Sequence, residues 1–401
     1  MREVAVVAAR RTPIGRYRGC LKDVRPDDLA ALVLQQVVQD IVLDPELVDD
    51  VLFGAANQAG EDNRNVARMA LLLAGFPVSV PGATFNRLCG SSLEAVNRGY
   101  QAISCGDADI IIAGGVESMT RAPFVLPKSR GGFPGGNQQL YDTSIGWRMI
   151  NPKLKERYYP YSMGETAENL AERFGIGREA QDAWALQSHQ RALRAQEGGQ
   201  FDREIVPVPI VDPKTQAITY VSRDEHPRPD TTLEKLRRLK PAFREGGTVT
   251  AGNASGLNDG AAAVVLMARE VAETRGIEPL AWIRATGVAG VDPAIMGYGP
   301  VPASKKALSR AGWSLRDIEQ VELNEAFAAQ VLAVLHDLPF DPAMVNPHGG
   351  AIALGHPLGA SGARILTTLI YGMQASGATR GLAAMCIGVG QGIATLVESP
   401  G

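Results

Sequence analysis

GGAIALGHPLG, residues 349–359, is the most informative stretch of this chain, because it surrounds one histidine with glycine. A histidine packed in an apolar core rarely needs glycine on both sides, whereas one that a bulky ligand approaches does. The natural role for His356 is that of a general base for a cysteine, and the alternative is a turn histidine without chemistry. A helical pattern over residues 361–373 follows directly.

Two strand patterns flank this stretch and bring further polar groups. Residues 321–323 form an apolar run that ends at Asn324, and residues 382–385 form another that ends at Cys386. In α/β sheets, ligands bind beyond the carboxyl ends of the strands. The alternation of strands and helices therefore predicts a layered α/β fold with its chemistry at one edge of a sheet.

The N-terminal part of the chain repeats this order. Its expected elements are a strand over 51–53 ending at Gly54, the segment NRLCGSS with Cys89, a helix over 91–104 and a buried strand over 110–113. Gly54 precedes Cys89 by about 35 residues, much as Asn324 precedes His356 by about 32. We therefore expect an internal duplication of topology, although the two parts share few identical residues.

The remaining patterns fill in both halves and set the middle of the chain apart. We further expect strands over 4–8, 261–267 and 282–285, and helices over 27–40 (with Asp27 or Asp28 as N-cap), 65–74 and 304–311. Residues 119–248 are rich in Pro, Gly, Arg and Tyr, with helical patterns over 162–174 and 178–197. The expected domains are 1–118 with 249–270, an inserted segment 119–248, and 271–401.

Composition limits the classes of function. The chain has 401 residues, 45 % of them apolar, and a net charge of −3, which disfavours general nucleic-acid binding. No apolar run reaches the about 18 residues of a membrane span, and we expect no secretory leader or peroxisomal address. Four cysteines without a CxxC pair favour reduced thiols over disulfides or a zinc site. We expect a cytoplasmic protein without a metal.

The two cysteines in glycine-rich surroundings are the candidate reactive thiols. Cys89 lies at the start of a helix, where free N–H groups and the helix dipole favour a thiolate and are expected to lower its pKa. Its own N–H is a candidate oxyanion donor. Cys386 is followed by Gly388, Gly390 and Gly392. The alternative for Cys89 is a small buried hydrophobe. The alternative for the glycine run after Cys386 is a nucleotide-binding motif, which would need a following helix with an acidic residue about twenty positions on.

The other cysteines and histidines lack such surroundings. Cys20 and Cys105 are expected to be structural, and His189, His226 and His336 to be packing or surface residues. His348 lies close to the glycine-rich segment in sequence, so contact with the site stays open for it.

The motifs taken together resemble the thiolase family. NRLCGSS resembles its nucleophile segment, NEAF its asparagine segment, GGAIALGHPLGASGAR its histidine segment, and CIGVGQG its second-cysteine segment. TAGNASGLNDGAAA (250–263) resembles its ligand-binding loop. The resemblance covers essentially the whole chain. It implies a five-layer αβαβα fold of two duplicated halves, with an inserted loop domain that binds coenzyme A and makes oligomer contacts.

The resemblance also implies roles for individual residues. Cys89 would accept the acyl group, His356 would activate it, and Cys386 would move the proton at the α-carbon. Asn324 would hold a water that joins His356 in one oxyanion hole, and the N–H groups of Cys89 and Gly388 would form the other. Residues implied to line the coenzyme A channel are Met163, Arg228, Phe243, Ser255, Ala326 and Phe327.

Substrate and assembly follow from the same resemblance. Coenzyme A would act as substrate, with acyl-CoA as its partner, and no further cofactor would be required. A basic run in the inserted segment (Arg228, Lys235, Arg237, Arg238 and Lys240) suits its phosphates, or is a solvated helix face. A homo-oligomer, dimer or tetramer, is expected. Ser92 and His348 depart from many members and raise the question of a reshaped acyl pocket.

The expected activity is reversible CoA-dependent cleavage of 3-ketoacyl-CoA through a Cys89 acyl-enzyme, or condensation of two acetyl-CoA, as in fatty acid metabolism. A β-ketoadipyl-CoA thiolase of aromatic degradation shares the motifs, notably in GEDNRNVARMALLLAGFPVSVPG. A decarboxylating ketoacyl synthase would carry histidine where Cys386 stands. A non-catalytic acyl-CoA or lipid carrier would have no need of Cys89, His356, Cys386 and Asn324 together.

Overall fold

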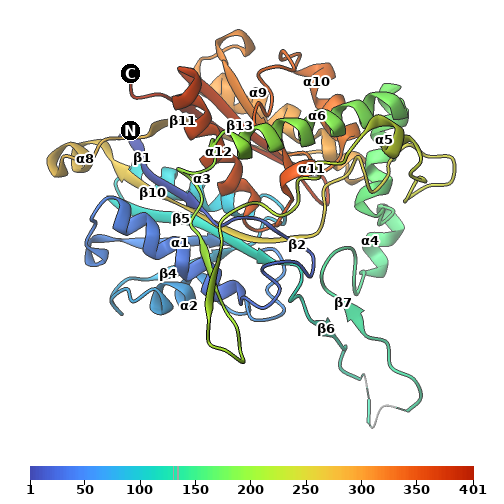
Figure 1. Ribbon diagram of the computed structural model, residues 1–401, viewed down its shortest axis with the longest axis horizontal. Helices are drawn as coiled ribbons and strands as arrows, with labels where there is room; N and C mark the ends of the chain where they lie inside the picture. The colour runs from blue at the N-terminus through green and yellow to red at the C-terminus, as the bar shows by residue number, and fades with distance from the viewer. Residues whose placement is uncertain (130, 133–134) are drawn as a thin grey trace.

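The computed structural model describes residues 1–129, 131–132 and 135–401 and has one large mixed sheet. Residues 130, 133 and 134, which fall in the expected inserted segment, lie outside the described residues. The strand order is β12-β13-β14-β11-β1-β10-β5-β3-β4, with β2 paired to β10. The middle of this order, the pair β1 and β11, divides it into two runs that match the two halves of the chain (Figure 1).

The first run carries the N-terminal strands. Its members are β1 (Val4–Arg11), β2 (Gly15–Arg16), β3 (Asp50–Gly54), β4 (Gly82–Phe85), β5 (Ile110–Ser118) and β10 (Asn258–Ala268). From β1 outward, β10 and β5 pair antiparallel, and β3 and β4 then pair parallel. β10 returns from beyond the inserted segment to lie between β1 and β5, so it completes this half.

The second run repeats that pairing with the C-terminal strands. They are β11 (Ala281–Gly290), β12 (Gln320–Leu323), β13 (Arg380–Ile387) and β14 (Gln391–Glu398). From β11 outward, β14 and β13 pair antiparallel and β12 pairs parallel with β13. A parallel bridge from Val321 to Val345 stands where the first half has β4. The same sequence of antiparallel and parallel pairs in both halves shows the duplication.

Three layers of helices and the two halves of the sheet together make five layers. α1 (Pro26–Asp40) and α2 (Val66–Leu73) cover the outside of the first half, and α9 (Pro300–Ala311) and α10 (Ala328–Asp337) that of the second (Figure 1). α3 (Ser91–Cys105) and α12 (Ser361–Ser376) pack against each other between the halves. One apolar cluster lies under each outer layer, and a third surrounds α3 and α12.

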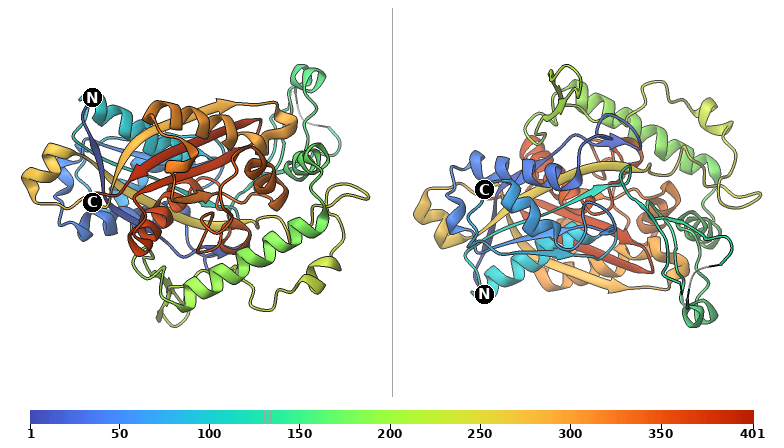
Figure 2. Two further views of the ribbon diagram at one scale, coloured as in Figure 1. Left: turned by 90° about the horizontal axis from the view of Figure 1, so that it is seen from above. Right: turned by 90° about the horizontal axis from the view of Figure 1, so that it is seen from below.

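The inserted segment lies along the outside of this core. Its elements are β6 (Phe124–Val125), β7 (Tyr141–Asp142), α4 (Pro152–Arg157), α5 (Met163–Phe174), α6 (Arg178–Glu197), β8 (Val208–Val211), β9 (Ile218–Val221) and α7 (Leu233–Arg237). Figure 2 shows α6 running along one flank of the molecule. The buried Arg11 anchors the segment, because its guanidinium binds Glu204 at 2.6 Å and Asp224 at 2.7 Å.

Short elements connect the larger ones. They are α8 (Arg269–Arg275), α11 (Ala351–Leu354) and 3₁₀ helices over Pro45–Leu47, Pro293–Tyr298 and Leu315–Asp317. Among the helices of the described residues, none has both the length and the apolar character needed to cross a bilayer.

Several expected boundaries are wrong. α1 starts at Pro26 with Arg25 as N-cap, so neither Asp27 nor Asp28 caps it. Proline suits the first helical turn because it has no N–H to satisfy there. β5 runs on through GGVES to Ser118, since its glycine and polar residues are all buried between layers. The strands β4 and β14 and the helix α10 were not expected at all.

Candidate active site

Cys89 lies on a tight turn directly before α3. Leu88 has a φ of 47°, in the left-handed region, so the backbone bends sharply just before the thiol. The turn is held by Ser91, whose hydroxyl accepts from the Arg87 N–H at 3.0 Å and donates to the Leu88 carbonyl at 2.6 Å. The nucleophile candidate therefore has a fixed position at the N-terminus of a central helix.

His356 lies before the other central helix, α12, and is 4 % exposed. Its Nδ1 lies 2.6 Å from Ser361 Oγ, and that hydroxyl donates its proton to the Pro357 carbonyl at 2.8 Å. A serine hydroxyl has one proton, so here Nδ1–H donates and Oγ accepts. This tautomer leaves the lone pair on Nε2, which is the form of imidazole that can take a proton from a thiol.

Asn324 comes directly after β12 and lies against the imidazole. Its Nδ2 is 3.4 Å from Nε2 and 3.5 Å from Nδ1 of His356. The side chain is buried, and within the described part of the chain its Oδ1 has no hydrogen-bond partner. That oxygen can accept a hydrogen bond from a water or from a ligand group.

Cys386 lies on β13, one residue before the strand ends, and is 1 % exposed. Gly388 follows in the turn to β14, and its backbone N–H faces the Cys89 thiol. Burial, and then the nearby Cys89 sulfur, raises the pKa of the Cys386 thiol above its usual range. The structure thus brings Cys89, Cys386 and Gly388 together, and it brings Asn324 and His356 together. The Asn324 N–H donates to the Ala384 carbonyl at 3.0 Å, which places the second pair beside β13, the strand that carries Cys386.

The electrostatics of this centre correct one expectation. Burial raises the pKa of the Cys89 thiol to about 11, although the N–H groups of Gly388 and Cys89 act in the opposite direction. The helix N-terminus therefore does not produce a low-pKa thiol. Burial also lowers the pKa of His356 to about 3, so the imidazole is neutral at physiological pH. At rest, Cys89 is therefore a thiol and His356 a neutral base.

A groove of about 420 Å³ approaches the centre from the inserted segment. Arg228, Phe243 and Ser255 line it, together with His189 and His226. Met163, Ala326 and Phe327 do not line this groove, but they pack in one cluster with Ala254, which does, and with Cys386. The Phe243 and Phe327 rings meet edge to face at 6.1 Å, and the Ser255 N–H donates to the Ala326 carbonyl at 3.0 Å.

Met163 lies next to Gly388, whose backbone N–H faces the Cys89 thiol. A Cβ placed on Gly388 would lie 3.4 Å from Met163 Sδ and 3.4 Å from Leu88. Of the six residues expected along the coenzyme A channel, Arg228, Phe243 and Ser255 line the groove. The other three, Met163, Ala326 and Phe327, pack in the apolar cluster that contains Cys386.

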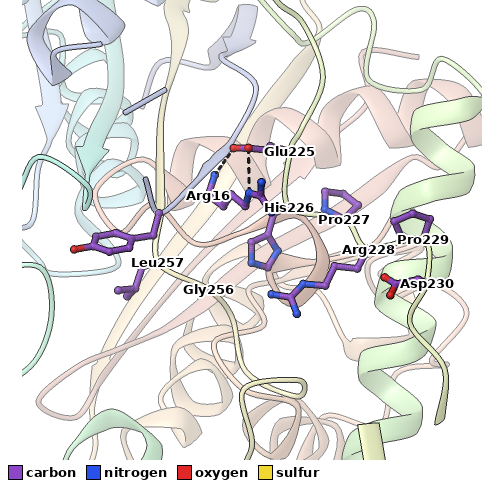
Figure 3. A pocket seen from close by; sticks show the side chains of 10 residues that line it. Arg16, Glu225, His226, Pro227, Arg228, Pro229, Asp230, Gly256 and Leu257 are labelled. Atoms are coloured by element: carbon purple, nitrogen blue, oxygen red, sulfur yellow. Dashed lines mark hydrogen bonds and ion pairs between the residues drawn. The ribbon is translucent and has the colours of Figure 1, made fainter. Parts of the chain in front are cut away.

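A second hollow, of about 520 Å³, adjoins the outer end of this groove. Figure 3 shows Arg16 turned to Glu225, and Arg228 reaching back toward the imidazole of His226. Arg228 makes no ion pair within the described residues, whereas Lys235, Arg237 and Arg238 pair with acidic neighbours. Arg228 is therefore the member of the expected basic run best placed to meet an anion in the groove.

The histidines of this groove have structural partners. His226 Nδ1 bonds the Ala353 carbonyl at 3.0 Å, and His189 Nδ1 accepts from the Arg228 N–H at 3.2 Å. Burial lowers the pKa of both, that of His189 to about 4, so neither adds positive charge at neutral pH. Both histidines line the groove, but they add no positive charge to it.

The two departures from family patterns, Ser92 and His348, both make packing or hydrogen-bond contacts with other parts of the fold. Ser92 is fully buried, and its hydroxyl accepts from the Ala363 N–H at 2.9 Å, which joins α3 to α12. His348 contacts the Phe201 ring at 6.4 Å and lies beside Gly372, near the far end of α12. His348 thus contacts Phe201 and Gly372, and Ser92 contacts Ala363; neither contact involves a residue expected at the reaction centre.

Several residues of the site were missed from the sequence. Asn258 Oδ1 accepts from the His356 N–H at 2.8 Å, and Ser361 holds the ring as described above. Glu325, inside NEAF, accepts from the Trp184 indole at 2.9 Å, the Ser188 hydroxyl at 2.7 Å and the Ile352 N–H at 3.1 Å. Asn258 lies in TAGNASGLNDGAAA and Glu325 in NEAF, so their position as polar residues inside these motifs is the sequence feature that could have identified them.

Across the described ranges, no group of three or more His, Cys, Asp or Glu side chains is arranged to hold a metal ion.

Comparison with known proteins agrees with this geometry. A family model described as "Thiolase, N-terminal domain" matches residues 4–270, and "Thiolase, C-terminal domain" matches residues 277–399. The chain is 53 % identical over 401 residues to the 3-oxoadipyl-CoA/3-oxo-5,6-dehydrosuberyl-CoA thiolase of Escherichia coli (strain K12), covering 99 % of this chain and 100 % of the relative. It is 54 % identical over 400 residues to the beta-ketoadipyl-CoA thiolase of Pseudomonas aeruginosa, covering 99 % of each.

Other relatives have different names. The acetyl-CoA acetyltransferase of Chromobacterium violaceum is 50 % identical, covering 99 % of this chain and all of the relative. The structure superimposes on the Bacillus anthracis acetyl-CoA acetyltransferase with a TM-score of 0.94 and 45 % identity, covering 100 % and 99 % of the two chains. Human mitochondrial 3-ketoacyl-CoA thiolase gives 0.93 and 42 %, covering 99 % of each. Since family models match both halves and relatives match nearly every residue, this chain belongs to the thiolase family.

Proposed function

We propose that this protein cleaves 3-ketoacyl-CoA with coenzyme A, giving acetyl-CoA and a shortened acyl-CoA, and that it catalyses the reverse condensation. The observation that carries the proposal is a pair of neighbouring thiols, Cys89 and Cys386, together with a neutral imidazole whose lone pair is on Nε2. That imidazole lies against Asn324, which is bonded to the strand that carries Cys386. A carrier protein would need none of these three groups in one place. A ketoacyl synthase is disfavoured because the third group is Cys386.

In the first half-reaction, Cys89 gives its proton to His356 Nε2, and the sulfur attacks the 3-keto carbonyl of the substrate. The bond between C2 and C3 breaks, which leaves an acyl group on Cys89 and a carbanion at C2 of the departing acetyl-CoA. Cys386 gives its proton to that carbon. Covalent catalysis of this kind splits one difficult step into two easier ones.

In the second half-reaction, the Cys386 thiolate takes the proton of the coenzyme A thiol. The coenzyme A sulfur then attacks the acyl group on Cys89, and the leaving Cys89 sulfur recovers its proton from His356. Both thiols and the imidazole return to their starting states, so protons balance over the cycle.

Two sets of donors would stabilise the negative oxygens of these steps. The N–H groups of Cys89 and Gly388 already face the Cys89 sulfur, which places them beside the carbonyl of an acyl-enzyme. His356 and Asn324 would serve the thioester oxygen of acetyl-CoA, with Asn324 acting through a water held by its carboxamide. Arg228 would meet the phosphates of coenzyme A at the outer end of the groove.

Among substrates, we put β-ketoadipyl-CoA first. Support comes from full-length relatives at 53 and 54 % identity that carry this substrate in their names, against 50 % for the acetyl-CoA acetyltransferase relative. This shifts the expected context from fatty acid metabolism to aromatic degradation. Acetoacetyl-CoA is the second candidate.

Steady-state cleavage of β-ketoadipyl-CoA, 3-oxohexanoyl-CoA and acetoacetyl-CoA tests this ranking through kcat/KM. A preference for acetoacetyl-CoA would overturn the substrate. Binding of acyl-CoA with no CoA-dependent cleavage of any of the three would overturn the enzyme and favour a carrier.

We also propose a cytoplasmic homo-oligomer, dimer or tetramer, that needs no cofactor besides coenzyme A as substrate. Light scattering coupled to size exclusion measures the assembly, and a monomeric mass would refute that part. Full activity after dialysis against a chelator would support the absence of a metal requirement.

A further inference from the structure

Glu117 is a fully buried acidic residue near the reaction centre that the proposed steps do not use. It lies on β5 with 1 % exposure and makes no ion pair within the part of the chain that the structure describes. Its carboxylate instead accepts three backbone N–H groups: from Gly359 at 2.8 Å, Ala56 at 2.9 Å and Asn57 at 3.2 Å. Burying a carboxylate without a cation is costly, so the position calls for a reason.

The three donors join the two halves of the protein. Ala56 and Asn57 follow β3 in the first half, whereas Gly359 lies three residues after His356 in the second. The backbone contact is tight: a Cβ on Gly359 would lie 2.4 Å from the Val116 carbonyl, and one on Gly115 would lie 2.1 Å from the Gly359 carbonyl. Glu117 therefore fixes the histidine segment against the half that carries Cys89.

The charge of Glu117 also acts on the nucleophile. It adds to the effect of burial in raising the pKa of Cys89. Burial raises the pKa of Glu117 itself to about 7, and the nearby Asp62 acts in the same direction. Asp259 is on the adjacent strand, but it pairs with Ser118 and binds its hydroxyl, on the opposite face from Glu117. Among the described residues, Asp62 and Cys89 are thus the titratable groups whose charges are coupled to that of Glu117.

We propose that Glu117 is a positioning residue of the thiolase reaction, which holds the His356 segment against the half that carries Cys89 through its three backbone hydrogen bonds. Its negative charge, which acts on Cys89, also disfavours a free thiolate there. The inference rests on the proposed function. It explains why a carboxylate stands where a neutral acceptor would fold at lower cost. A free thiolate would be open to alkylation and oxidation, whereas a thiol that ionises only by transfer to His356 reacts in the substrate complex.

Two substitutions separate the two roles. Glu117→Gln removes the charge but keeps an oxygen within reach of Ala56 and Gly359. Glu117→Asp keeps the charge but shortens the side chain by one methylene, so it cannot reach Gly359 and Ala56 as before. Asp50→Asn is the matched control, because Asp50 is a partly buried carboxylate at the start of β3, the end away from Ala56 and Asn57.

The first readout is alkylation of Cys89 by iodoacetamide as a function of pH, measured by mass spectrometry without substrate. Glu117→Gln should react about 3- to 10-fold faster than wild type near pH 8, because the thiolate then forms more readily. Glu117→Asp and Asp50→Asn should follow the wild-type profile. A Glu117→Gln profile that coincides with wild type would overturn the role of the charge.

The second readout is the split between kcat and KM in thiolytic cleavage. Glu117→Asp should lower kcat about 5- to 30-fold, the equivalent of one or two lost hydrogen bonds, with an unchanged KM for coenzyme A. Wild-type kcat in a folded Glu117→Asp protein would overturn the positioning role, and so would a loss confined to KM. An inactive wild type would instead refute the proposed function, while the alkylation readout would still test the charge.

Discussion

Removal of the Ser361 hydroxyl is the sharpest test of how the imidazole is prepared. In the wild type, His356 Nδ1 donates to Ser361 Oγ at 2.6 Å, and both groups are buried. In Ser361→Ala, a buried Nδ1–H loses its acceptor, which costs about 1–3 kcal/mol. The ring can avoid that cost by moving its proton to Nε2, but then Nε2 can no longer take the proton of Cys89. We expect kcat/KM for thiolytic cleavage to fall about 5- to 150-fold.

The assay is the disappearance of the 3-ketoacyl-CoA substrate, together with a thermal melt that confirms folding. Thr367→Val is the matched control, because Thr367 is an equally buried hydroxyl on α12 that donates to the Ala363 carbonyl at 2.9 Å and does not touch the imidazole. It should keep activity within about twofold of wild type, as expected for a change remote from the site. If Ser361→Ala matched Thr367→Val in activity, the assigned tautomer and the role of Nε2 as base would be refuted.

Three further outcomes are expected. Cys89→Ser should lower kcat by at least about a thousandfold and leave no acyl adduct detectable by mass spectrometry after incubation with substrate, because an alcohol is a far weaker nucleophile here. Arg228→Ala should raise KM for coenzyme A about 5- to 20-fold with kcat nearly unchanged, as for loss of a charged hydrogen bond that substrate and transition state share; an unchanged KM would place the phosphates elsewhere. Inactivation of the free enzyme by iodoacetamide should keep accelerating above pH 9, since the pKa of Cys89 lies near 11, and a plateau near pH 8 would contradict that value.

Stability toward acid follows from the buried imidazole. Because the folded pKa of His356 is lowered to about 3, the unfolded chain binds this proton more readily between about pH 6.5 and pH 3. The contribution of the neutral ring is therefore complete above pH 6.5 and is lost as the pH falls through that range. Glu117 acts in the opposite sense, because its raised pKa of about 7 favours the fold at low pH and that contribution is lost as the pH rises.

The sequence revealed the positions of the reaction centre better than its chemistry. His356 between glycines and Cys386 at the end of an apolar run could be singled out because local patterns mark them. The pKa of Cys89 was expected in the wrong direction, since the helix start is visible in sequence but the burial that outweighs it is not. Packing of one half on the other decides that burial.

Residues that act through distant backbone groups were beyond sequence reasoning. Glu117 lies within an apolar strand, and its donors Asn57 and Gly359 are 60 and 242 residues away. Asn258 is 98 residues from the His356 N–H that it accepts. Spacing along the chain carries no signal for such contacts, because the turns that aim an N–H at a carboxylate are set by tertiary structure.

The duplication explains why the nucleophile Cys89 and the base His356 come from different halves. Each half supplies one central helix, and the starts of α3 and α12 meet where Ser92 binds the Ala363 N–H and a Cβ on Gly362 would lie 2.5 Å from the Leu93 nitrogen. Groups placed just before the two helices must therefore face each other, and Cys89 and His356 hold those places. Neither half has both a nucleophile and a base there. The angle and spacing at which the halves pack thus set the distance over which the proton moves. Contacts across this boundary, that of Glu117 with Gly359 among them, therefore bear on rate as well as on stability.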